Sequence, residues 1–368
     1  MQKIIAFLFI TLMFIGCGDK DTDSKELIQN FNFAEFLTQA HNQNNNALDI
    51  ISHKAQTLGM QNLQSTIGLT KIYILEGELN GEKATATLKI SSLPHYYTDD
   101  QTPTQNGIAY ISGTITRGKE TFVLNGEVDS ATHTQPITLS IDRGELEESI
   151  TSQSFEAYIT QQGELSATFT NGAIFPNDTK VNFKKPQGRI SEINIIHATV
   201  SQKSESELGY RLLEIATQIP IISKVEGKNL AIETINNTLE QMVKKAIDSI
   251  DSEDTEYSFG STLNFNPRYI DEKVLVFELL SSLYTGGAHG SYDMQAVAFD
   301  ITNGNLLTNT LETLLKDTNN PTLMAMVKER LAQQYKEGEL FNENPSLSRF
   351  IITPNGVEFY WGIYEIAP

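Results

Sequence analysis

The sequence contains a single cysteine, Cys17, among 368 residues. One cysteine forms no disulfide within the chain and cannot supply a thiolate metal cluster. The chain is also poor in basic residues, with 27 lysines and arginines against 46 acidic residues and a formal net charge of −19. Nucleic-acid phosphates need clustered basic side chains, so this balance argues against a nucleic-acid partner and favours a basic one. A well-solvated acidic surface without a partner is the alternative interpretation.

Sequence motifs of the established catalytic classes are also missing. The chain has no His-Glu-x-x-His zinc helix, no Gly-x-Ser-x-Gly nucleophile elbow and no phosphate-binding loop. We therefore predict no cofactor and no metal, and favour a non-catalytic protein. A cell-wall-modifying enzyme whose site carries no recognisable motif is the alternative.

The longest apolar run lies at the N-terminus, over residues 4–15, directly after Lys3. Its 12 residues are too few to span a bilayer but suit the core of a signal peptide. The run from Met13 to Cys17 resembles a bacterial lipobox, in which the cysteine is lipidated. Residues 1–17 are thus predicted to be a lipoprotein signal peptide. Cys17 would anchor the chain to a membrane of the bacterial cell envelope, facing the periplasm or the exterior. A simple signal peptide with an incidental cysteine is the alternative.

The N-terminal half divides into a tether and a strand-rich region. Residues 18–66 are polar with short helical patterns, which predicts a tether with short helices. From residue 67 to residue 186 the apolar residues alternate, and turn signals such as Asn80-Gly81 separate about eight short runs. This pattern predicts an all-β antiparallel meander or small barrel. Such a barrel either fills itself with side chains or holds a ligand.

The C-terminal half follows a predicted linker at Pro186–Gly188 and mixes helix and strand signals. Apolar residues keep three- and four-residue spacing over 230–250, which predicts a helix. A second helix is expected after Pro321, whereas the apolar run 212–222 fits either a strand or a helix. The irregular order of these elements predicts an α+β domain over residues 189–368.

A glycine-rich turn with one histidine stands out within that half. The apolar run Val274–Leu280 leads into Tyr284–Gly290, and a second strand pattern follows through Val297 and Ile301. Three glycines within five residues permit backbone conformations that side chains forbid, or the close approach of another surface. The pattern predicts a hairpin whose loop presents His289.

Three segments resemble one family: Tyr284–Gly290, Phe299–Gly304 and Tyr364–Pro368. It is the extracytoplasmic C-terminal domain shared by RsiV-type anti-sigma factors and PdaC-type peptidoglycan deacetylases, and the resemblance covers roughly residues 190–368. It implies an envelope domain, which binds lysozyme in RsiV-type members and accompanies a separate catalytic domain in PdaC-type members. We see no match to that catalytic domain or to the RsiV-type transmembrane helix, and expect neither deacetylase nor anti-sigma activity.

The expected function is that of a lipid-anchored, non-catalytic envelope protein that binds a cell-wall component such as peptidoglycan, or a lysozyme-like protein. The alternatives are a cell-wall-modifying enzyme and a structural envelope lipoprotein. The candidate partner-binding residues are those of the glycine-rich turn: Tyr284, Thr285, Gly286, Gly287, His289, Gly290 and Tyr292. For His289, a purely structural role in holding the turn is the competing interpretation.

Overall fold

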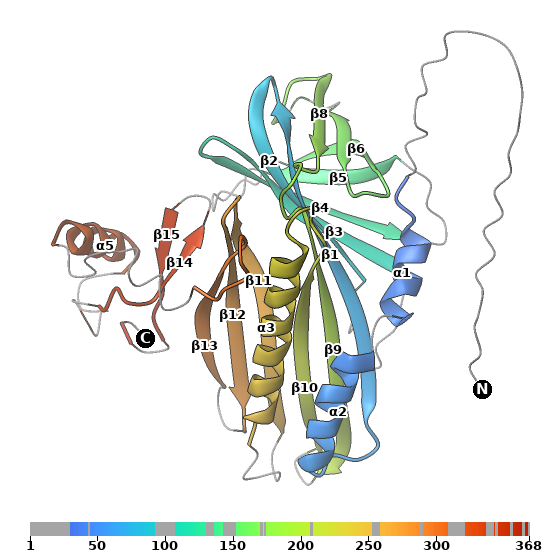
Figure 1. Ribbon diagram of the computed structural model, residues 1–368, viewed down its shortest axis with the longest axis vertical. Coiled ribbons are helices and arrows are strands. Elements are labelled where there is room, and N and C mark those ends of the chain that lie inside the picture. Colours follow the sequence, from blue (N-terminus) through green and yellow to red (C-terminus); the bar gives the residue numbers. More distant parts are fainter. Residues whose placement is uncertain are drawn as a thin grey trace, which may run out of the picture.

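The chain is mostly β. The computed structural model describes residues 30–42, 45–92, 107–129, 136–142, 152–169, 174–206, 209–251, 258–286, 290–307, 321–335, 345–353, 356–362 and 365–366, with Gly172 and Asn342. Among these residues, thirteen strands form one sheet in the order β13-β12-β11-β10-β9-β1-β2-β3-β4-β5-β6-β7-β8, and two more form a separate hairpin, β14-β15. Figure 1 shows the β2–β8 strands at one end of the molecule and the β9–β13 strands at the other.

The first eight strands close into an antiparallel barrel, because β8 pairs back onto β1. Their bounds are β1 Gln64–Leu79, β2 Glu82–Ser91, β3 Ile108–Arg117, β4 Glu120–Asp129, β5 Ile137–Asp142, β6 Ser152–Ile159, β7 Leu165–Phe169 and β8 Thr179–Lys184. Gly77 in β1 permits the closure, since a Cβ there would lie 2.3 Å from the backbone oxygen of Asn182 in β8. The predicted antiparallel β region is thus confirmed, in its barrel form.

The interior of the barrel is packed with aromatic side chains. Phe155 and Phe169 stack with ring centroids 4.6 Å apart, and Phe175 lies 4.8 Å from both Phe169 and Phe122. Each of these four rings is buried. Aromatic contacts of this kind add to the stabilisation that their apolar burial provides. Among the described residues, side chains therefore fill this part of the barrel.

Strand β1 joins the barrel to the rest of the sheet. Its last residues, Glu76–Leu79, pair with β8, whereas Gln64–Tyr73 pair with β9 (Glu192–Ser206). The whole second half of β1 also pairs with β2. One hydrophobic cluster accordingly runs from Phe31 to Ile301, through both parts of the sheet. The predicted linker at 186–188 lies in the β8–β9 connection, and the independence of the two parts stays a prediction.

Beyond β9 the same sheet continues through four strands: β10 Gly209–Ile222, β11 Phe259–Ile270, β12 Val274–Tyr284 and β13 Ser291–Asp300. Only β10 and β11 are parallel, and α3 (Asn229–Asp248) provides the crossover between them. The ambiguous run 212–222 is thus a strand. The predicted β12–β13 hairpin and the predicted helix over 230–250 are both confirmed.

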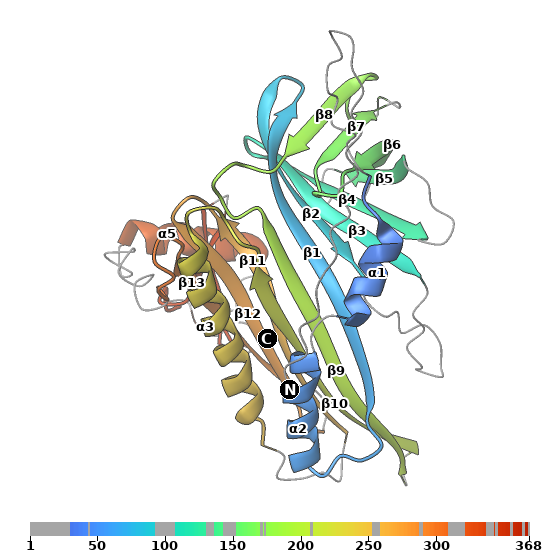
Figure 2. The same cartoon turned by 45° about the vertical axis from the view of Figure 1, so that its right-hand side comes forward.

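Helices cover one face of this sheet, as Figure 2 shows. Helix α3 lies on β10, and α2 (Asn45–Thr57) lies on β9 and β10. The buried stripe of α3 keeps helical spacing: Ala231, Ile232, Ile235, Leu239, Val243 and Ile247. Helix α1 (Phe33–Asn42) packs on β1, with Phe33 and Phe36 buried. The segment predicted as a tether therefore contributes side chains to the core.

The C-terminal elements form small clusters of their own. The β14–β15 hairpin (Phe350–Thr353 and Gly356–Phe359) packs through Phe350 and Ile351 against Val276 and Ala298 of β12 and β13. Helix α5 (Pro321–Gln334), predicted from Pro321, packs through Leu331 against Ile366. The expected C-terminal α+β domain is only partly present. Its strands are a continuation of the barrel sheet, because β1 pairs on both sides.

Candidate functional site

One face of the β9–β13 sheet is not covered by α2 or α3, and we call it the open face. Along β10 the alternate residues Leu213 and Ile215 are buried on the helix side, whereas Glu214, Ala216 and Gln218 on the opposite side are partly exposed. The same alternation continues in β11 and in parts of β9 and β12. Ile195 and Val276 are buried on the open side, where Phe350 and Ile351 of β14 pack against Val276 and cover that part of the face. Because successive side chains of a strand point to opposite faces, the open face carries the polar set.

Strand register aligns a row of small and hydroxyl side chains across the open face. The row consists of Thr66, Thr199, Ala216, Thr262, Ser282 and Tyr292, from β1, β9, β10, β11, β12 and β13. The hydroxyl oxygens of Thr262 and Ser282 lie 2.6 Å apart, which confirms that neighbours in the row meet. All six are at least partly exposed. The open face therefore presents hydroxyl groups in a line, with a tyrosine at its end.

The open face is concave where it meets the barrel. Lys89 on β2 donates from Nζ to Oδ1 of Asn266 on β11, at 3.4 Å. Strands β1, β9 and β10 lie between these two strands, and four strand spacings in a flat sheet would amount to about 19 Å. The sheet must therefore curl toward the open face. Burial and the nearby Arg268 guanidinium lower the pKa of Lys89, and Arg268 itself pairs with Glu278 at 3.0 Å and with Glu358.

A partly buried chain of polar side chains lies beside this contact. Nε2 of His197 on β9 lies 2.8 Å from Oγ1 of Thr70, which lies 2.9 Å from Oγ of Ser91. Burial lowers the pKa of His197 to about 4, so the imidazole is neutral at neutral pH. A neutral histidine next to a hydroxyl can accept its proton. Thr70 is buried, however, so the group best placed to react is shielded from solvent, and the chain serves to satisfy buried polar groups.

The predicted partner-binding residues lie at the far end of the same sheet. Tyr284 ends β12, Thr285 and Gly286 follow it, and Gly290 and Tyr292 begin the return along β13. Gly287 and His289 lie outside the described residues, as does Cys17.

The local backbone explains why two positions of this turn are glycine. Gly286 has φ of +97°, a conformation that disfavours side chains. A Cβ on Gly290 would lie 2.9 Å from the backbone oxygen of Leu283. Tyr284 and Tyr292 share the open face, because Tyr292 pairs with Ser282, which lies two residues from Tyr284 on the same strand. Tyr292 is 53% exposed. The fold thus brings the predicted tyrosines to the row of hydroxyls.

Sequence reasoning missed the row and the Lys89–Asn266 contact. The row could have been found from the threonines and serines at alternate positions of otherwise apolar strands. The sequence did not show which strands become neighbours, because pairing partners lie as far apart as Gln64 and Ser201, a separation of 137 residues.

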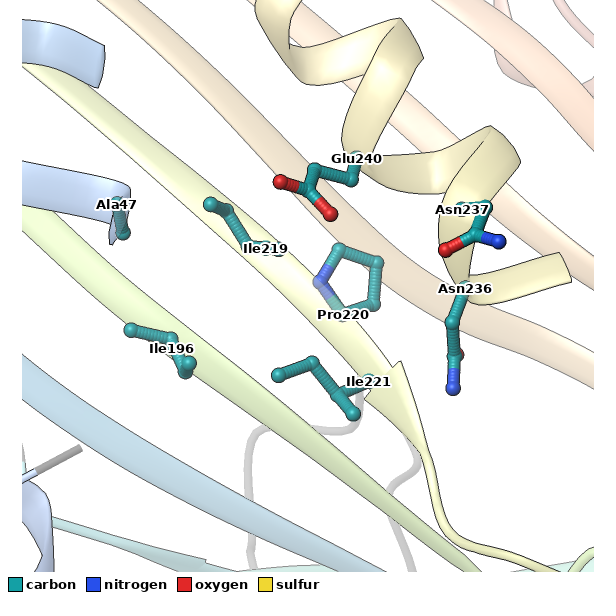
Figure 3. Close-up of a pocket in the computed structure, with 8 residues that line it drawn as sticks. All are labelled: Ala47, Ile196, Ile219, Pro220, Ile221, Asn236, Asn237 and Glu240. Atoms are coloured by element: carbon teal, nitrogen blue, oxygen red, sulfur yellow. The ribbon is translucent and has the colours of Figure 1, made fainter. Parts of the chain in front are cut away.

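A pocket of about 190 Å³ lies on the other, helix-covered side (Figure 3). Its floor consists of Ile196, Ile219 and Ile221, and Asn236 and Glu240 of α3 form one wall. Small-molecule sites usually have roughly 300–1,000 Å³. Asn236 is also engaged with the backbone of Ile222 on β10. The pocket is therefore a weaker candidate than the open face.

Two kinds of feature are not found among the described residues. No three or more His, Cys, Asp or Glu side chains in that part of the chain gather closely enough to hold a metal ion. None of the helices there combines the length and the apolar character needed to cross a membrane.

Comparison with known proteins yields weak structural likenesses only. No family model matches the chain, and no curated protein matches its sequence. A crystal structure of a DUF3298 family member from Bacteroides fragilis shares 17% identity, covering 50% of this chain and 88% of that one, with a TM-score of 0.29. A DUF3298 family protein from Pseudomonas aeruginosa shares 19% identity over 46% of this chain and 84% of its own, with a TM-score of 0.28. TM-scores this low carry no argument about the fold or the function.

Proposed function

We propose that the chain is a lipid-anchored, non-catalytic binding protein of the bacterial cell envelope, and that its open face binds a cell-wall component of the peptidoglycan type. The observation that carries this proposal is the row of hydroxyl side chains that ends at the exposed Tyr292. A sugar chain offers hydroxyl and amide groups that such a row can hydrogen-bond, and an aromatic ring offers an apolar face to a sugar ring. The lipobox at Cys17 and the resemblance of residues 190–368 to the RsiV- and PdaC-type domain support the envelope location.

The test is sedimentation of the mature, non-lipidated chain with insoluble peptidoglycan. Ala216→Arg places a long side chain in the middle of the row and should weaken binding by about tenfold or more, the equivalent of roughly 1.4 kcal/mol. Tyr158→Arg is the matched control, because Tyr158 is an exposed residue of the barrel, 46% accessible and away from the row. Equal binding by both variants and the parent chain would refute the open-face site.

A basic, lysozyme-like protein is the second candidate partner, favoured by charge. Residues 189–368 carry 14 basic and 25 acidic groups, a net charge of −11. Attraction from such a surface chiefly raises the association rate. Specific binding should persist at about 0.3 M salt, where the Debye length is roughly 5–6 Å.

The mature chain is the proper reagent for this test, because residues 189–368 alone lack β1, the partner of β9. Tyr292→Ala with His289→Ala should then weaken binding by about tenfold, and loss of binding with salt would mean nonspecific attraction.

A further inference from the structure

Among the residues that the structure describes, the outer edge of β13 has hydrogen-bonded backbone groups along one half and unpaired backbone groups along the other. In the described sheet, β13 is a terminal strand, and β14 and β15 lie beside it in Figure 1. Toward its C-terminal end, the edge groups of β13 are paired. The amide of Asp300 donates to the oxygen of Asn305, the oxygen of Ala298 accepts from the amide of Leu307, and the amide of Ala296 donates to the hydroxyl of Tyr360.

These three bonds fix which residues of β13 point their backbone outward. Residues 296, 298 and 300 do so, and because the direction alternates along a strand, Tyr292 and Met294 do as well. No hydrogen bond within the described part of the chain reaches the backbone N–H or C=O of Tyr292 or Met294 on that side. The open groups are those of Tyr292 and Met294, a stretch that a short extended segment could pair with.

The strand has few of the devices that protect an edge. Proteins block exposed edges with charged side chains, above all lysine, with proline or with a bulge, and in its open stretch β13 has only the charge of Asp293. Its N-terminal residues are accessible, with Tyr292 exposed at 53% and Asp293 and Gln295 also exposed. Capping of the C-terminal half by Tyr360 and Leu307, next to an uncapped N-terminal half, is the arrangement of a strand-addition site.

We propose that the β13 edge at residues 292–294 binds an extended peptide segment of a partner protein, in which basic and apolar residues alternate. Side chains of an added strand fall alternately on the two faces of the sheet. On the open face they meet the ring of Tyr292 and the thioether of Met294. On the opposite face they meet Asp293, whose carboxylate accepts from Gln295 at 3.0 Å. A basic side chain complements that carboxylate, and an aliphatic one complements the ring and the thioether.

A second copy of the chain fits the edge less well than a short peptide does. Antiparallel pairing of two β13 strands centred on Met294 would place residue 292 of each copy opposite Ala296 of the other. The amide of Ala296 is already bonded to the hydroxyl of Tyr360, which occupies the edge at that point. A peptide of a few residues needs only the open stretch. The proposal rests on the strand edge alone and is independent of the ligand of the open face.

The test measures binding of a fluorescently labelled peptide, Val-Lys-Val-Lys-Val, to the mature chain by anisotropy. Met294→Pro removes the outward N–H at an edge position where proline leaves the β12 ladder intact, and Met294→Ala keeps that N–H. We expect Met294→Pro to weaken binding by about tenfold and Met294→Ala by no more than about twofold, as loss of one hydrogen bond implies. Unchanged binding by Met294→Pro, with native circular dichroism, overturns the proposal.

Two further arms keep the test decisive if Met294→Pro does not fold. N-methylation of the peptide at alternate residues should abolish binding in one register and spare it in the other, whereas equal binding by both methylated peptides overturns strand addition. A Val-Glu-Val-Glu-Val peptide should bind the parent chain more weakly than the lysine peptide, and Asp293→Lys should reverse that order. Sedimentation equilibrium that shows a dimer of the parent chain, lost in Met294→Pro, would assign the edge to a second copy and overturn the peptide assignment.

Discussion

Asn236 on α3 holds the backbone of Ile222 on β10 through two hydrogen bonds. Its Oδ1 accepts from the amide of Ile222 at 2.8 Å, and its Nδ2 donates to the oxygen of the same residue at 3.0 Å. Strand β10 pairs with β11 only as far as Thr217, so beyond that point its edge has lost its strand partner. The asparagine side chain takes the place of a neighbouring strand at Ile222. In the same region a side chain of β10 bonds to the backbone of β11, because Oε1 of Gln218 accepts from the amide of Phe265 at 2.8 Å.

Asn236→Ala should therefore destabilise the fold. It leaves both backbone groups of Ile222, a buried residue, without their partner. An unsatisfied buried polar group costs about 1–3 kcal/mol, and we expect a loss of unfolding free energy of about 2 kcal/mol in urea titrations. The matched control is Asn237→Ala, at the next, exposed position of the same helix, which should change stability by less than about 0.5 kcal/mol. Equal stability of the two variants would contradict the bridging role.

Protonation of His197 should destabilise the protein in mild acid. Burial lowers the pKa of this imidazole from 6.5 to about 4 in the folded chain. Between those values the unfolded chain binds the proton and the folded chain does not, so the unfolding free energy falls as the pH falls. From pH 7 to pH 4.5 the loss should be about 2 kcal/mol.

The measurement compares urea unfolding of the parent chain with that of His197→Gln, in which Thr70 keeps a hydrogen-bonding partner but the titrating group is absent. Other groups titrate alike in both proteins, so the difference between the two pH profiles isolates His197. Parallel profiles from pH 7 to pH 4.5 would show that the imidazole is not held neutral.

Gly77→Ala should open the barrel at its closure. A Cβ at that position would lie 2.3 Å from the backbone oxygen of Asn182 and 2.8 Å from the ring of Phe183. Backbone of β8 must then move away from β1, and overpacking of this kind costs about 1–3 kcal/mol. Gly260→Ala is the matched control, since a Cβ there meets only the Cβ of Tyr284, at 4.0 Å. A thermal midpoint for Gly77→Ala equal to that of Gly260→Ala would be inconsistent with the tight β1–β8 contact.

Cys17→Ser should abolish lipid attachment, because a serine hydroxyl does not accept the lipid that the lipobox cysteine would carry. The expected result is loss of labelled-palmitate incorporation and release of the protein from the membrane fraction. Ser24→Ala, a neutral change a few residues further along, should leave both unchanged. Incorporation of palmitate by Cys17→Ser at the level of the parent chain would contradict the lipoprotein assignment.

Local patterns in the sequence predicted individual elements well, and long-range pairing limited the rest. The spacing of Ile232, Ile235 and Leu239 predicted α3, and the run from Val274 predicted β12. The run 212–222 could not be assigned, because a continuous apolar stretch fits a buried strand as well as a helix. It became β10 through its pairing with β9.

The candidate site shows the same limit more sharply. Tyr284 and Tyr292 were found from the glycines between them, a local signal. Their common face with Thr262 and Thr199 depends on register across five strands, and the Lys89–Asn266 contact depends on the curl of the whole sheet. Alternation along one strand says which residues share a face, but not which strands lie next to it.

The pairing of β1 with the distant strand β9 also sets an order of events during synthesis. Strand β1 ends at Leu79, but the part of β9 that pairs with β1 extends to Ser201, about 120 residues further along the chain. At roughly 5–20 residues per second, the edge of β1 emerges about 6–24 s before its pairing strand exists. Leu69, Ile72 and Tyr73, which are buried in the finished protein, lie in the stretch that waits. A nascent chain of this protein thus carries an unpaired strand edge through much of its synthesis, and any chain cut short before residue 201 should need a chaperone to stay in solution.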